Sequence, residues 1–387
     1  MSEVIRVMQV GMTENRGGLE SYIMNLYRNI DRNKIQFDFF TLKGQKIAYQ
    51  EEIESMGGRI YDIGYKKREI LNHYLRFPVT FFKKHPEIKI IHFHKTSLID
   101  IDYVLLSHFS QVPIRIIHSH SSSNMFKSGR LIKTIESWNV KNIDKFVTNK
   151  LACSKVAGEW LFPGSDYKIV KNTIDTSKFK FNHLNRIEIR EKYHIPLDAY
   201  VIGHIGYFTD VKNHSFIIDI FIKLIQSGEN FYLVLIGDGQ LKEEILEKVK
   251  RHGLSDKVIF TGSVDSVYKY LSAMDLFILP SKFEGFPISA VEAQCSGLPT
   301  LLSDSITNEV KILENCSFLP INSSDKWKEK IMEEKKIKNE IFNESDYELL
   351  RKKASLSVKE NGYDIEVEAM NMENFYAESL LNKGNVL

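Results

Sequence analysis

Short apolar runs alternate with segments of helical periodicity through the first half of the chain. The runs are rich in Ile, Val and Phe and cover residues 5–10, 35–42, 59–64, 88–94, 114–120 and 145–154. A helix is expected to begin at about Gly18, directly after the first run. Short β-rich runs separated by helices are typical of βα units, so this half is predicted to form a parallel sheet.

The same pattern starts again after a polar interval. Residues 173–198 are polar and are interpreted as a linker and lead-in, and a second set of apolar runs covers residues 199–206, 231–239, 257–262, 276–281 and 299–304. Residues 364–382 are expected to form a last helix. We therefore predict an α/β protein with two doubly wound domains, 1–170 and 171–363, because 387 residues exceed one ordinary core. Ligands of such folds bind beyond the carboxyl ends of the strands, here expected in a crevice between the domains.

Composition changes this picture little. The chain is 43% hydrophobic and 26% charged, and no apolar run is long enough to cross a bilayer. The first residues, MSEVIRVMQVG, are expected to form a strand rather than a signal peptide. Three scattered cysteines, Cys153, Cys295 and Cys316, have no metal or redox spacing and are interpreted as reduced thiols of a cytoplasmic protein.

Charge is distributed unevenly along the chain. Residues 1–170 carry 25 Lys and Arg against 17 Asp and Glu, whereas the remainder carries 27 against 33. The basic residues cluster at 66–68, 83–84 and 127–133, which favours an anionic surface or substrate near the first domain; chance asymmetry is the alternative. Nucleic acid is not expected as a partner, because the clusters lack interleaved aromatic side chains or a recognisable motif.

Two loops that follow predicted strands have the chemistry of anion sites. Gly17 and Gly18 open a helix, where backbone N–H groups favour a phosphate, although a simple strand–helix turn would also use glycine. Lys212 precedes a helix that Asn213 could cap. A lysine at a helix N-terminus opposes the helix dipole, so its position is explained if an anion binds there; an exposed loop lysine is the alternative.

The stretch SKFEGFPISAVEAQCSG, residues 281–297, places two glutamates eight positions apart. Pro287 suits the first position of a helix that Gly297 would close. Glu284 is then expected to face the crevice beside unpaired amides, with Glu292 about two turns further on. A carboxylate in so apolar a helix is costly unless it is paired, which favours a functional role over a solvated Glu284 and a buried, hydrogen-bonded Glu292.

Other polar patterns give weaker signals. Two His-x-His pairs close predicted strands, namely His92/His94 and His118/His120. Nothing nearby completes a metal site at either pair, so we expect hydrogen bonding in the crevice for one histidine and core positions for the rest. Asp100 and Asp102 match the D-x-D spacing of metal-dependent sugar transferases, but acidic residues are ordinary at the start of a helix.

Taken together, these motifs resemble those of the retaining family-4 glycosyltransferases, and most closely the bacterial members that build exopolysaccharide or capsule. The resemblance covers nearly the whole chain and is carried by RGGLESYIMNLYRNIDRNKIQFDF, HSHSSS, VKNHSF, LVLIGDG, FTG and PSKFEGFPISAVEAQCSGLPTLLSDSI. It implies the GT-B fold, in which two Rossmann-like domains face each other across a cleft and a C-terminal helix, about 364–387, returns to the N-terminal, acceptor-binding domain. The second domain would hold the nucleotide sugar.

The resemblance also implies roles for individual residues. Glu292 would hold the ribose hydroxyls, and Lys212 would neutralise the diphosphate. Glu284 would contact the donor sugar together with the backbone of Gly285, Phe286 and Pro287. The amides of Gly17 and Gly18 would close over the phosphates. His120 best matches the family's crevice histidine, with His118 as the second choice.

Two positions depart from the family's pattern. The family often has an arginine shortly before the lysine that matches Lys212, whereas this chain has Tyr207 in GYFTDVKN. One positive charge facing the diphosphate is therefore missing. The family's NGID is NTID here, and Thr173 would fit poorly if that turn requires a positive φ.

The function implied by the resemblance is retaining transfer of a hexose-type sugar from a nucleoside diphosphate sugar, with UDP favoured, to a lipid-linked saccharide. No cofactor, metal or protein nucleophile is expected. The protein would be cytoplasmic and peripheral at the inner face of an anionic plasma membrane, with possible partners in polysaccharide assembly. Three alternatives stay open: a non-catalytic nucleotide-sugar-binding subunit, suggested by Tyr207; a non-hydrolysing UDP-sugar epimerase; and a metal-dependent transferase that uses Asp100 and Asp102.

Overall fold

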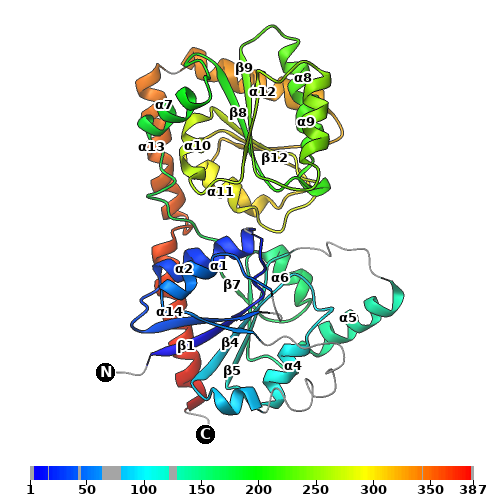
Figure 1. Ribbon diagram of the computed structural model, residues 1–387, viewed down its shortest axis with the longest axis vertical. Coiled ribbons are helices and arrows are strands. Elements are labelled where there is room, and N and C mark those ends of the chain that lie inside the picture. The colour runs from blue at the N-terminus through cyan, green and yellow to red at the C-terminus, as the bar shows by residue number, and fades with distance from the viewer. Residues whose placement is uncertain are drawn as a thin grey trace. The chain divides into compact units, whose positions relative to one another are not determined.

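The computed structural model describes residues 4–15, 17–41, 45–62, 80–121, 129–341 and 343–384. The chain divides into two compact units (Figure 1). Unit 1 contains the residues up to 173 together with the C-terminal segment from Ile365, and unit 2 is Ile174–Asp364. The sequence placed these boundaries at 170/171 and 363/364. The basic cluster at 66–68 and the end of the strand predicted at 59–64 lie outside the described residues, as does Lys127.

Unit 1 is built on a seven-stranded parallel sheet in the order β3-β2-β1-β4-β5-β6-β7. Its strands are β1 (Ile5–Val10), β2 (Ile35–Thr41), β3 (Arg59–Asp62), β4 (Ile88–Lys95), β5 (Ile114–Ser119), β6 (Asn149–Ala152) and β7 (Lys168–Ile169). The helices of this unit are α1 (Gly18–Asn29), α2 (Gln50–Ser55), α4 (Asp102–Phe109), α5 (Arg130–Asn142), α6 (Lys155–Leu161) and α14 (Ile365–Gly384). A short 3₁₀ turn, η2 (Ile143–Lys145), follows α5.

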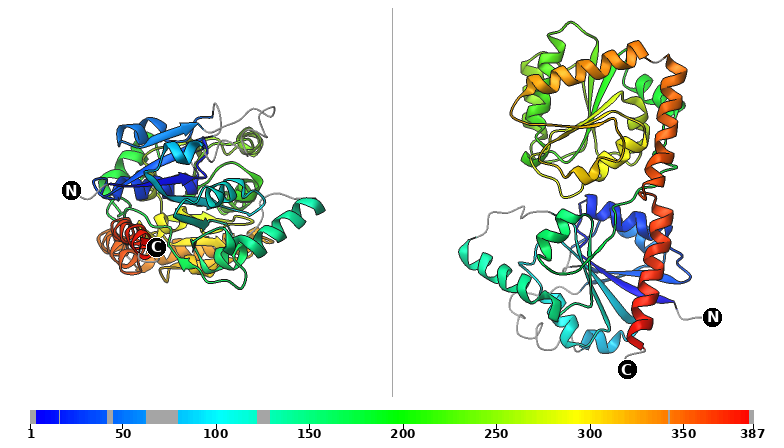
Figure 2. Two further views of the ribbon diagram at one scale, coloured as in Figure 1. Left: turned by 90° about the horizontal axis from the view of Figure 1, so that it is seen from below. Right: turned by 180° about the vertical axis from the view of Figure 1, so that it is seen from behind.

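The last helix, α14, belongs to unit 1, although the chain reaches it only after completing unit 2. It packs against α1, and Figure 2 shows it alongside the unit 1 sheet. Tyr376 anchors the helix: its ring is fully buried and edge-on to Phe37, and its hydroxyl lies 2.8 Å from His92 Nδ1. The C-terminal helix therefore returns to the first domain, as the resemblance implied.

Unit 2 repeats the plan with a six-stranded parallel sheet in the order β10-β9-β8-β11-β12-β13. Its strands are β8 (Tyr200–Ile205), β9 (Phe231–Ile236), β10 (Val258–Gly262), β11 (Leu276–Leu279), β12 (Thr300–Ser303) and β13 (Cys316–Leu319). Its helices are α7 (His183–Lys192), α8 (His214–Ile225), α9 (Lys242–Arg251), α10 (Val267–Ala273), α11 (Ile288–Cys295), α12 (Ser324–Ile341) and α13 (Glu344–Glu360), with 3₁₀ turns η3 (Asp210–Lys212) and η4 (Asn308–Val310). Both predicted sheets are thus confirmed, and β7 and β13 are strands that the sequence pattern did not predict.

The polar segment 173–198 is not a linker, contrary to the sequence interpretation. It contains α7, which packs against α10 within unit 2. Two arginines of α7 reach the carboxylate of Asp275, which is fully buried just before β11: Arg186 at 2.9 Å and Arg190 at 2.7 Å. The charged residues that made this segment look solvent-exposed are instead paired inside the fold.

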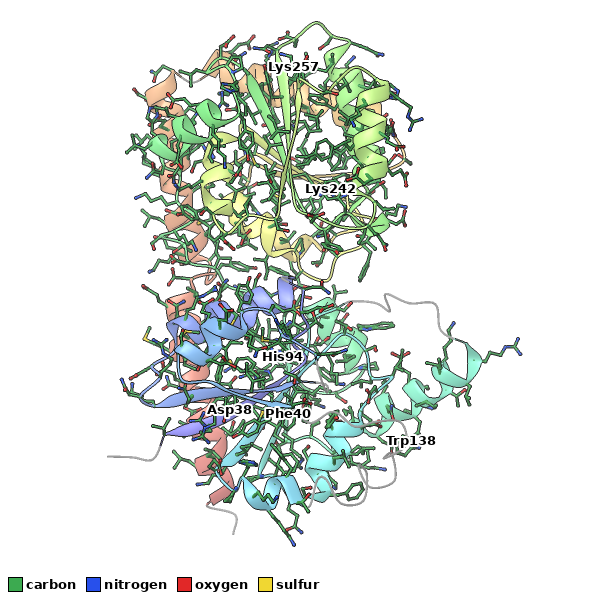
Figure 3. All side chains as sticks on the ribbon, in the orientation of Figure 1. Asp38, Phe40, His94, Trp138, Lys242 and Lys257 are labelled. Atoms are coloured by element: carbon green, nitrogen blue, oxygen red, sulfur yellow. The ribbon has the colours of Figure 1, made fainter. Side chains whose placement is uncertain are left out.

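Apolar side chains of the strands and helices form a separate core in each unit. The unit 1 cluster includes Phe93, Ile91 and Ile117 from the central strands, and Figure 3 shows the side chains of this unit around Phe40 and His94. The unit 2 cluster includes Leu233 from β9 and the fully buried Trp327 of α12. Within the described part of the chain, no helix has both the length and the hydropathy needed to cross a membrane.

Candidate active site

The strand order reverses once in each sheet, and in unit 2 this point lies between β8 and β11. Open α/β sheets bind ligands beyond the carboxyl ends of the two strands at such a point. The segments that follow β8 and β11 are residues 206–213 and 280–287. They contain Lys212 and Glu284, so the two candidate residues occupy the position that the topology favours.

The side chains of Lys212 and Glu284 meet directly. Lys212 Nζ lies 2.5 Å from Glu284 Oε1, and the same oxygen accepts a hydrogen bond from Ser281 Oγ at 2.7 Å. Both partners are largely shielded, with 21% of the Lys212 side chain and 14% of the Glu284 side chain exposed. An ammonium group is therefore held at the carboxyl end of the sheet, where a carboxylate balances its charge.

Further contacts join the two loops on either side of this pair. Lys282 donates its backbone N–H to Val211 O at 2.8 Å, and its ammonium lies 2.5 Å from Asp210 Oδ1. Asn213 is the N-cap residue of α8 and has the left-handed conformation, but its side chain donates to Pro280 O at 3.2 Å rather than capping the helix as predicted. The loops after β8 and β11 thus form one connected structure.

The glycines of IGDG allow a third loop to approach this structure. Gly237 has φ +137°, and a Cβ atom there would lie 2.1 Å from Gly206 O. Gly239 has φ +148°, and a Cβ there would lie within 3 Å of the backbone of Phe208. Phe208 N also donates to Asp238 O at 2.7 Å. These glycines therefore let the β9–α9 loop pack directly on the loop that carries Lys212.

The residues after Glu284 lead into α11. Pro287 is the N-cap of this helix, one position earlier than predicted, and Gly297 has φ +70° just beyond its end. Phe286 is buried and stacks on Tyr363 with ring centroids 5.9 Å apart, which fixes the turn between Gly285 and Pro287. The first amides of α11 lie at the site end of the helix, where a helix favours negatively charged groups.

Glu292 lies in α11, half-buried among apolar neighbours. Among the described residues, no hydrogen bond or ion pair reaches its carboxylate. Burial raises its pKa from the usual 4.5 to about 7, while the positive charge of Lys178 acts in the opposite direction. A half-buried carboxylate with no hydrogen bond or ion pair among the described residues destabilises the fold, which is expected of a group that binds a ligand.

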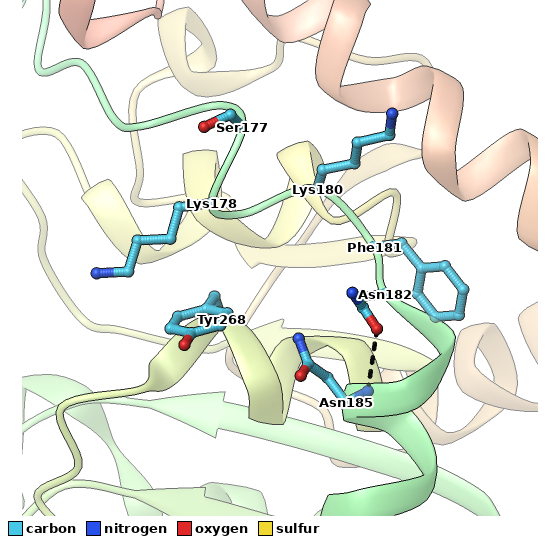
Figure 4. A pocket seen from close by; sticks show the side chains of 7 residues that line it. All are labelled: Ser177, Lys178, Lys180, Phe181, Asn182, Asn185 and Tyr268. Atoms are coloured by element: carbon cyan, nitrogen blue, oxygen red, sulfur yellow. Dashed lines mark hydrogen bonds between the residues drawn. The ribbon is translucent and has the colours of Figure 1, made fainter.

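Lys178 is a residue that sequence reasoning missed. It lies over the ring of Tyr268 at 5.3 Å and lines a cavity of about 360 Å³ (Figure 4). The cavity is lined by Ser177, Lys178, Lys180, Phe181, Asn182, Asn185 and Tyr268. The sequence did not identify Lys178 as a site residue, because a lysine in a polar segment is common. Its effect on Glu292 depends on how residues 174–182 pack against the rest of unit 2.

Glu292 makes donor binding dependent on pH. Ribose hydroxyls donate hydrogen bonds to the ionised carboxylate, so we expect affinity for a UDP-sugar to rise by up to roughly tenfold from about pH 6 to about pH 8. Glu292→Gln should bind more weakly at the higher pH and lose this dependence. Isothermal titration calorimetry with a UDP-sugar checks this, since its diphosphate diester does not titrate in the range. A steep dependence in the Gln variant would show that another group is responsible.

The same variant should also change stability. A carboxyl whose folded-state pKa of about 7 exceeds its unfolded value of 4.5 destabilises the fold, and the cost grows as pH rises through this interval. Glu292→Gln should therefore raise the free energy of unfolding by about 1–3 kcal/mol near pH 8 and have little effect near pH 4. Urea unfolding at both pH values measures this. Equal destabilisation at both would mean that the carboxylate has a packing role only.

In unit 1, the amide of Gly17 is already occupied. Gly17 is the N-cap of α1, and its N–H donates to Glu20 Oε2 at 3.1 Å. Glu20 also accepts from Thr13 N at 3.0 Å and Thr13 Oγ1 at 2.7 Å. A phosphate at this helix end would meet the buried Glu20 carboxylate, so the structure gives no support to a phosphate contact by Gly17 in this state. The contact predicted for Gly18 stays a prediction.

His92, His94, His118 and His120 of unit 1 form one group of neighbouring rings at the carboxyl ends of β4 and β5. His118 is fully buried, and neither of its ring nitrogens has a partner among the described residues. His120 is half-buried, and its Nε2 lies 2.9 Å from His94 Nδ1. His120 is therefore the member that a substrate can reach, whereas His92, His94 and His118 are core histidines.

A hydrogen-bond chain sets the tautomer of His120. His94 Nε2 lies 2.8 Å from Gln9 Oε1, an acceptor, so His94 carries its proton on Nε2 and accepts at Nδ1. The proton shared with His120 then belongs to His120 Nε2, which leaves Nδ1 of His120 as an acceptor. Burial lowers the pKa of His120 to about 3, so the ring is neutral near pH 7. The arrangement suits a hydrogen bond from a sugar hydroxyl.

His92, His94 and His118 present ring nitrogens within 4.8 Å of one another, the only such group of three potential metal ligands among the described residues. Both nitrogens of His94 are already engaged, by Gln9 and by His120, so this ring would have to give up a hydrogen bond to bind an ion. Asp100 belongs to no such group. Its carboxylate accepts from the backbone N–H of Asp102, the first residue of α4, at 3.0 Å, which is an ordinary role for an acidic residue just before a helix.

Of the two departures from the family pattern, the structure resolves the one at Thr173. Tyr207 is 54% exposed beside the Lys212 loop and adds no charge there. Thr173 is fully buried and is not among the described residues with positive φ. The turn therefore accepts threonine, and the difficulty expected at NTID does not arise.

Comparisons with known proteins agree with this geometry. Residues 185–345 match the family described as "Glycosyl transferases group 1". The putative glycosyltransferase EpsF of Bacillus subtilis strain 168 is 35% identical over 315 residues, which cover 79% of this chain and 80% of EpsF. The capsular polysaccharide biosynthesis glycosyltransferase CapH of Staphylococcus aureus is 25% identical over 297 residues, covering 75% and 79%. The chain belongs to the group 1 glycosyl transferase family.

Solved structures show the same fold at low sequence identity. Anabaena HepE in complex with UDP has a TM-score of 0.78 and 14% identity, covering 96% of this chain and all of that one. Anabaena HepE in complex with UDP-glucose has a TM-score of 0.77 and 16% identity, covering 96% of this chain and 99% of the other. Both are similar to this chain in having two Rossmann-like domains of the GT-B type.

Proposed function

We propose that this glycosyltransferase moves a hexose-type sugar from a nucleoside diphosphate sugar, with UDP favoured, to a lipid-linked saccharide during surface polysaccharide synthesis. The observation that carries the proposal is the Lys212–Glu284 pair at the carboxyl ends of β8 and β11. Glu284 lies on the loop that continues into α11, which carries Glu292. The similarity to the glycosyltransferase EpsF, to the capsular polysaccharide biosynthesis glycosyltransferase CapH, and to HepE, solved in complex with UDP, supports the substrate class and the setting.

The proposed reaction needs its charge stabilised on the leaving group. As the bond from the sugar to the diphosphate breaks, negative charge develops on the phosphate oxygens. Lys212 and the N-terminal amides of α11 would stabilise this charge without a metal. Glu284, together with the backbone of Gly285, Phe286 and Pro287, would orient the sugar, and Glu292 would hold the ribose. His120 of unit 1 would accept a hydrogen bond from a substrate hydroxyl through Nδ1.

We further propose that the anomeric configuration is retained. The acceptor hydroxyl would attack from the face that the leaving diphosphate occupies, and a phosphate oxygen would take its proton. The contacts of Glu284 favour this front-face attack over a double displacement through Glu284, because its carboxylate is engaged by Lys212 and Ser281 rather than placed as a free nucleophile. The product's anomeric configuration, determined by NMR, tests the proposal.

The test of the function is release of nucleoside diphosphate from a panel of UDP- and GDP-sugars, with and without a bacterial membrane lipid extract. We expect acceptor-dependent release from one donor. Conversion of a UDP-sugar without any acceptor would identify an epimerase. Donor binding without release would instead favour a nucleotide-sugar-binding subunit, an alternative kept open by the uncharged Tyr207.

The same assay tests metal independence. Because Lys212 and helix amides supply the positive charge, EDTA should leave the rate within about twofold of the untreated rate. Asp100→Asn/Asp102→Asn should behave like the wild-type protein. If EDTA abolishes activity and added Mn²⁺ or Mg²⁺ restores it, the prediction is wrong and the reaction is metal-dependent.

A further inference from the structure

Helix α5 of unit 1 leaves its apolar side chains uncovered. Leu131 is 75% exposed, Ile135 46% and Trp138 54%. The three residues are four and three positions apart, so they share one face of the helix. Figures 1 and 2 show α5 extending away from the sheet of its own unit. Stripes of large apolar side chains are costly in water and mark interaction surfaces.

The C-terminal end of α5 attaches the helix to the core of unit 1. Asn139 is buried near its C-terminus and donates Nδ2 to Leu98 O at 2.6 Å, and Val140 packs against the unit 1 core. The first nine residues of the helix include no buried side chain. The helix is therefore fixed to the core at its C-terminal end, and most of its apolar stripe is left exposed.

A second element extends the apolar surface. Phe109, the last residue of α4, is 71% exposed. Its neighbour His108 packs edge-on to Phe146 with ring centroids 5.4 Å apart, and Phe146 contacts Trp138 at 6.4 Å. Figure 3 shows Trp138 on α5. We call Phe109, Leu131, Ile135 and Trp138 the α5 apolar patch.

Basic side chains flank this patch. Helix α5 carries Arg130, Lys133 and Lys141 against a single acid, Glu136. At 100° per residue, Arg130 and Lys141 fall on one edge of the stripe formed by Leu131, Ile135 and Trp138, whereas Lys133 falls on the opposite face of the helix. A helix with a large apolar stripe, a basic edge and a tryptophan is suited to the boundary of an anionic lipid surface.

We propose that α5 docks unit 1 on an anionic lipid bilayer, with the α5 apolar patch inserted at the headgroup boundary and Arg130 and Lys141 against lipid phosphates. The inference rests on the proposed function, in which the acceptor is lipid-linked. A protein partner fits less well, because the positive charges border the apolar stripe on a helix that stands away from its domain. Binding is then both apolar and electrostatic, so high salt weakens it without abolishing it.

The test uses the full chain and sedimentation with vesicles of phosphatidylcholine and phosphatidylglycerol. Leu131→Gln/Ile135→Gln/Trp138→Gln should lower the vesicle partition coefficient by roughly 100-fold or more. The matched control is Leu349→Gln/Leu356→Gln on α13, where the leucines are 52% and 59% exposed; it should change partitioning by less than about twofold. Wild-type partitioning by the triple variant would overturn the proposal.

Tryptophan quenching locates the contact directly. Lipids brominated on their acyl chains should quench Trp138, and Trp138→Phe should keep binding to vesicles while losing most of the quenching. If the wild-type protein does not bind vesicles but forms oligomers that the triple variant does not form, the patch is an interface between copies and the proposal is wrong.

UDP-sugar affinity measured on the same samples distinguishes failure of this proposal from failure of the proposed function. Absence of donor binding with vesicle binding intact would reject the proposed function and leave the membrane surface standing.

Discussion

Lys212→Ala is expected to lower the rate constant for sugar transfer by about 1000-fold or more, the range seen when the main positive charge facing a developing anion is removed. The expectation follows from the position of Lys212 after β8, where its ammonium is held 2.5 Å from Glu284. With Tyr207 uncharged beside it, no arginine of the same loop shares the task. Steady-state release of nucleoside diphosphate measures the effect.

The matched control for Lys212 is Lys282. Lys282 lies on the loop after β11, is 45% exposed and pairs with Asp210 at 2.5 Å, so Lys282→Ala removes a comparable ion pair from the same loops. It should keep the rate within about threefold of wild type, because exposed ion pairs contribute little. Equal losses in the two variants would show that loop integrity, rather than the Lys212 charge, determines the rate. Full activity of Lys212→Ala would reject its proposed role.

Asp275→Ala is expected to lower the free energy of unfolding of unit 2 by about 3–5 kcal/mol. Asp275 is fully buried and pairs with Arg186, Arg190 and Lys338 at 2.7–2.9 Å, and it also accepts the N–H of Val201 at 2.8 Å. Alanine would leave three cations near an apolar interior without their common counter-charge. These cations hold the pKa of Asp275 well below its usual value against the effect of burial, so the stabilisation should fade as pH falls below about 4.

Urea unfolding followed through Trp327 measures the Asp275 effect, because this tryptophan is buried in unit 2. The matched control is Asp325→Ala, which removes an exposed carboxylate that pairs with Lys223 at 2.7 Å and should leave the midpoint within experimental error. Asp275 precedes β11 and therefore lies at the opposite end of this strand from Glu284. Donor affinity of the folded Asp275 variant should match wild type; a large loss of affinity with an unchanged unfolding midpoint would contradict a stabilising role.

Most of the fold could be predicted because local sequence patterns determine where its strands and helices form. The apolar runs that became β1, β8, β9 and β11 are continuous and bounded by glycine or polar turns, as expected of strands buried on both faces. Lys212 and Glu284 followed from the same pattern, since they come directly after two of these runs. Short strands such as β13, CSFL, lack a long apolar run and gave no such signal.

Other features depend on contacts between distant segments. Arg186 and Arg190 are charged residues in a polar stretch, and only the packing of α7 on α10 shows that they are buried on Asp275. The tautomer of His120 depends on Gln9 of β1 through His94. The occupied amide of Gly17 depends on Glu20, a residue whose sequence position alone is compatible with ordinary helix capping. The periodicity of apolar residues also does not show which face of α5 packs on the core and which stays exposed.

The most direct test of the central claim is a crystal structure of the chain with bound UDP. We expect the diphosphate within hydrogen-bonding distance of Lys212 Nζ and the first amides of α11, and the ribose hydroxyls on the Glu292 carboxylate. The Lys212–Glu284 contact should lengthen as the ammonium turns to the phosphate. UDP bound away from the segments after β8 and β11, or bound there with the ribose remote from Glu292, would contradict the assignment of this site.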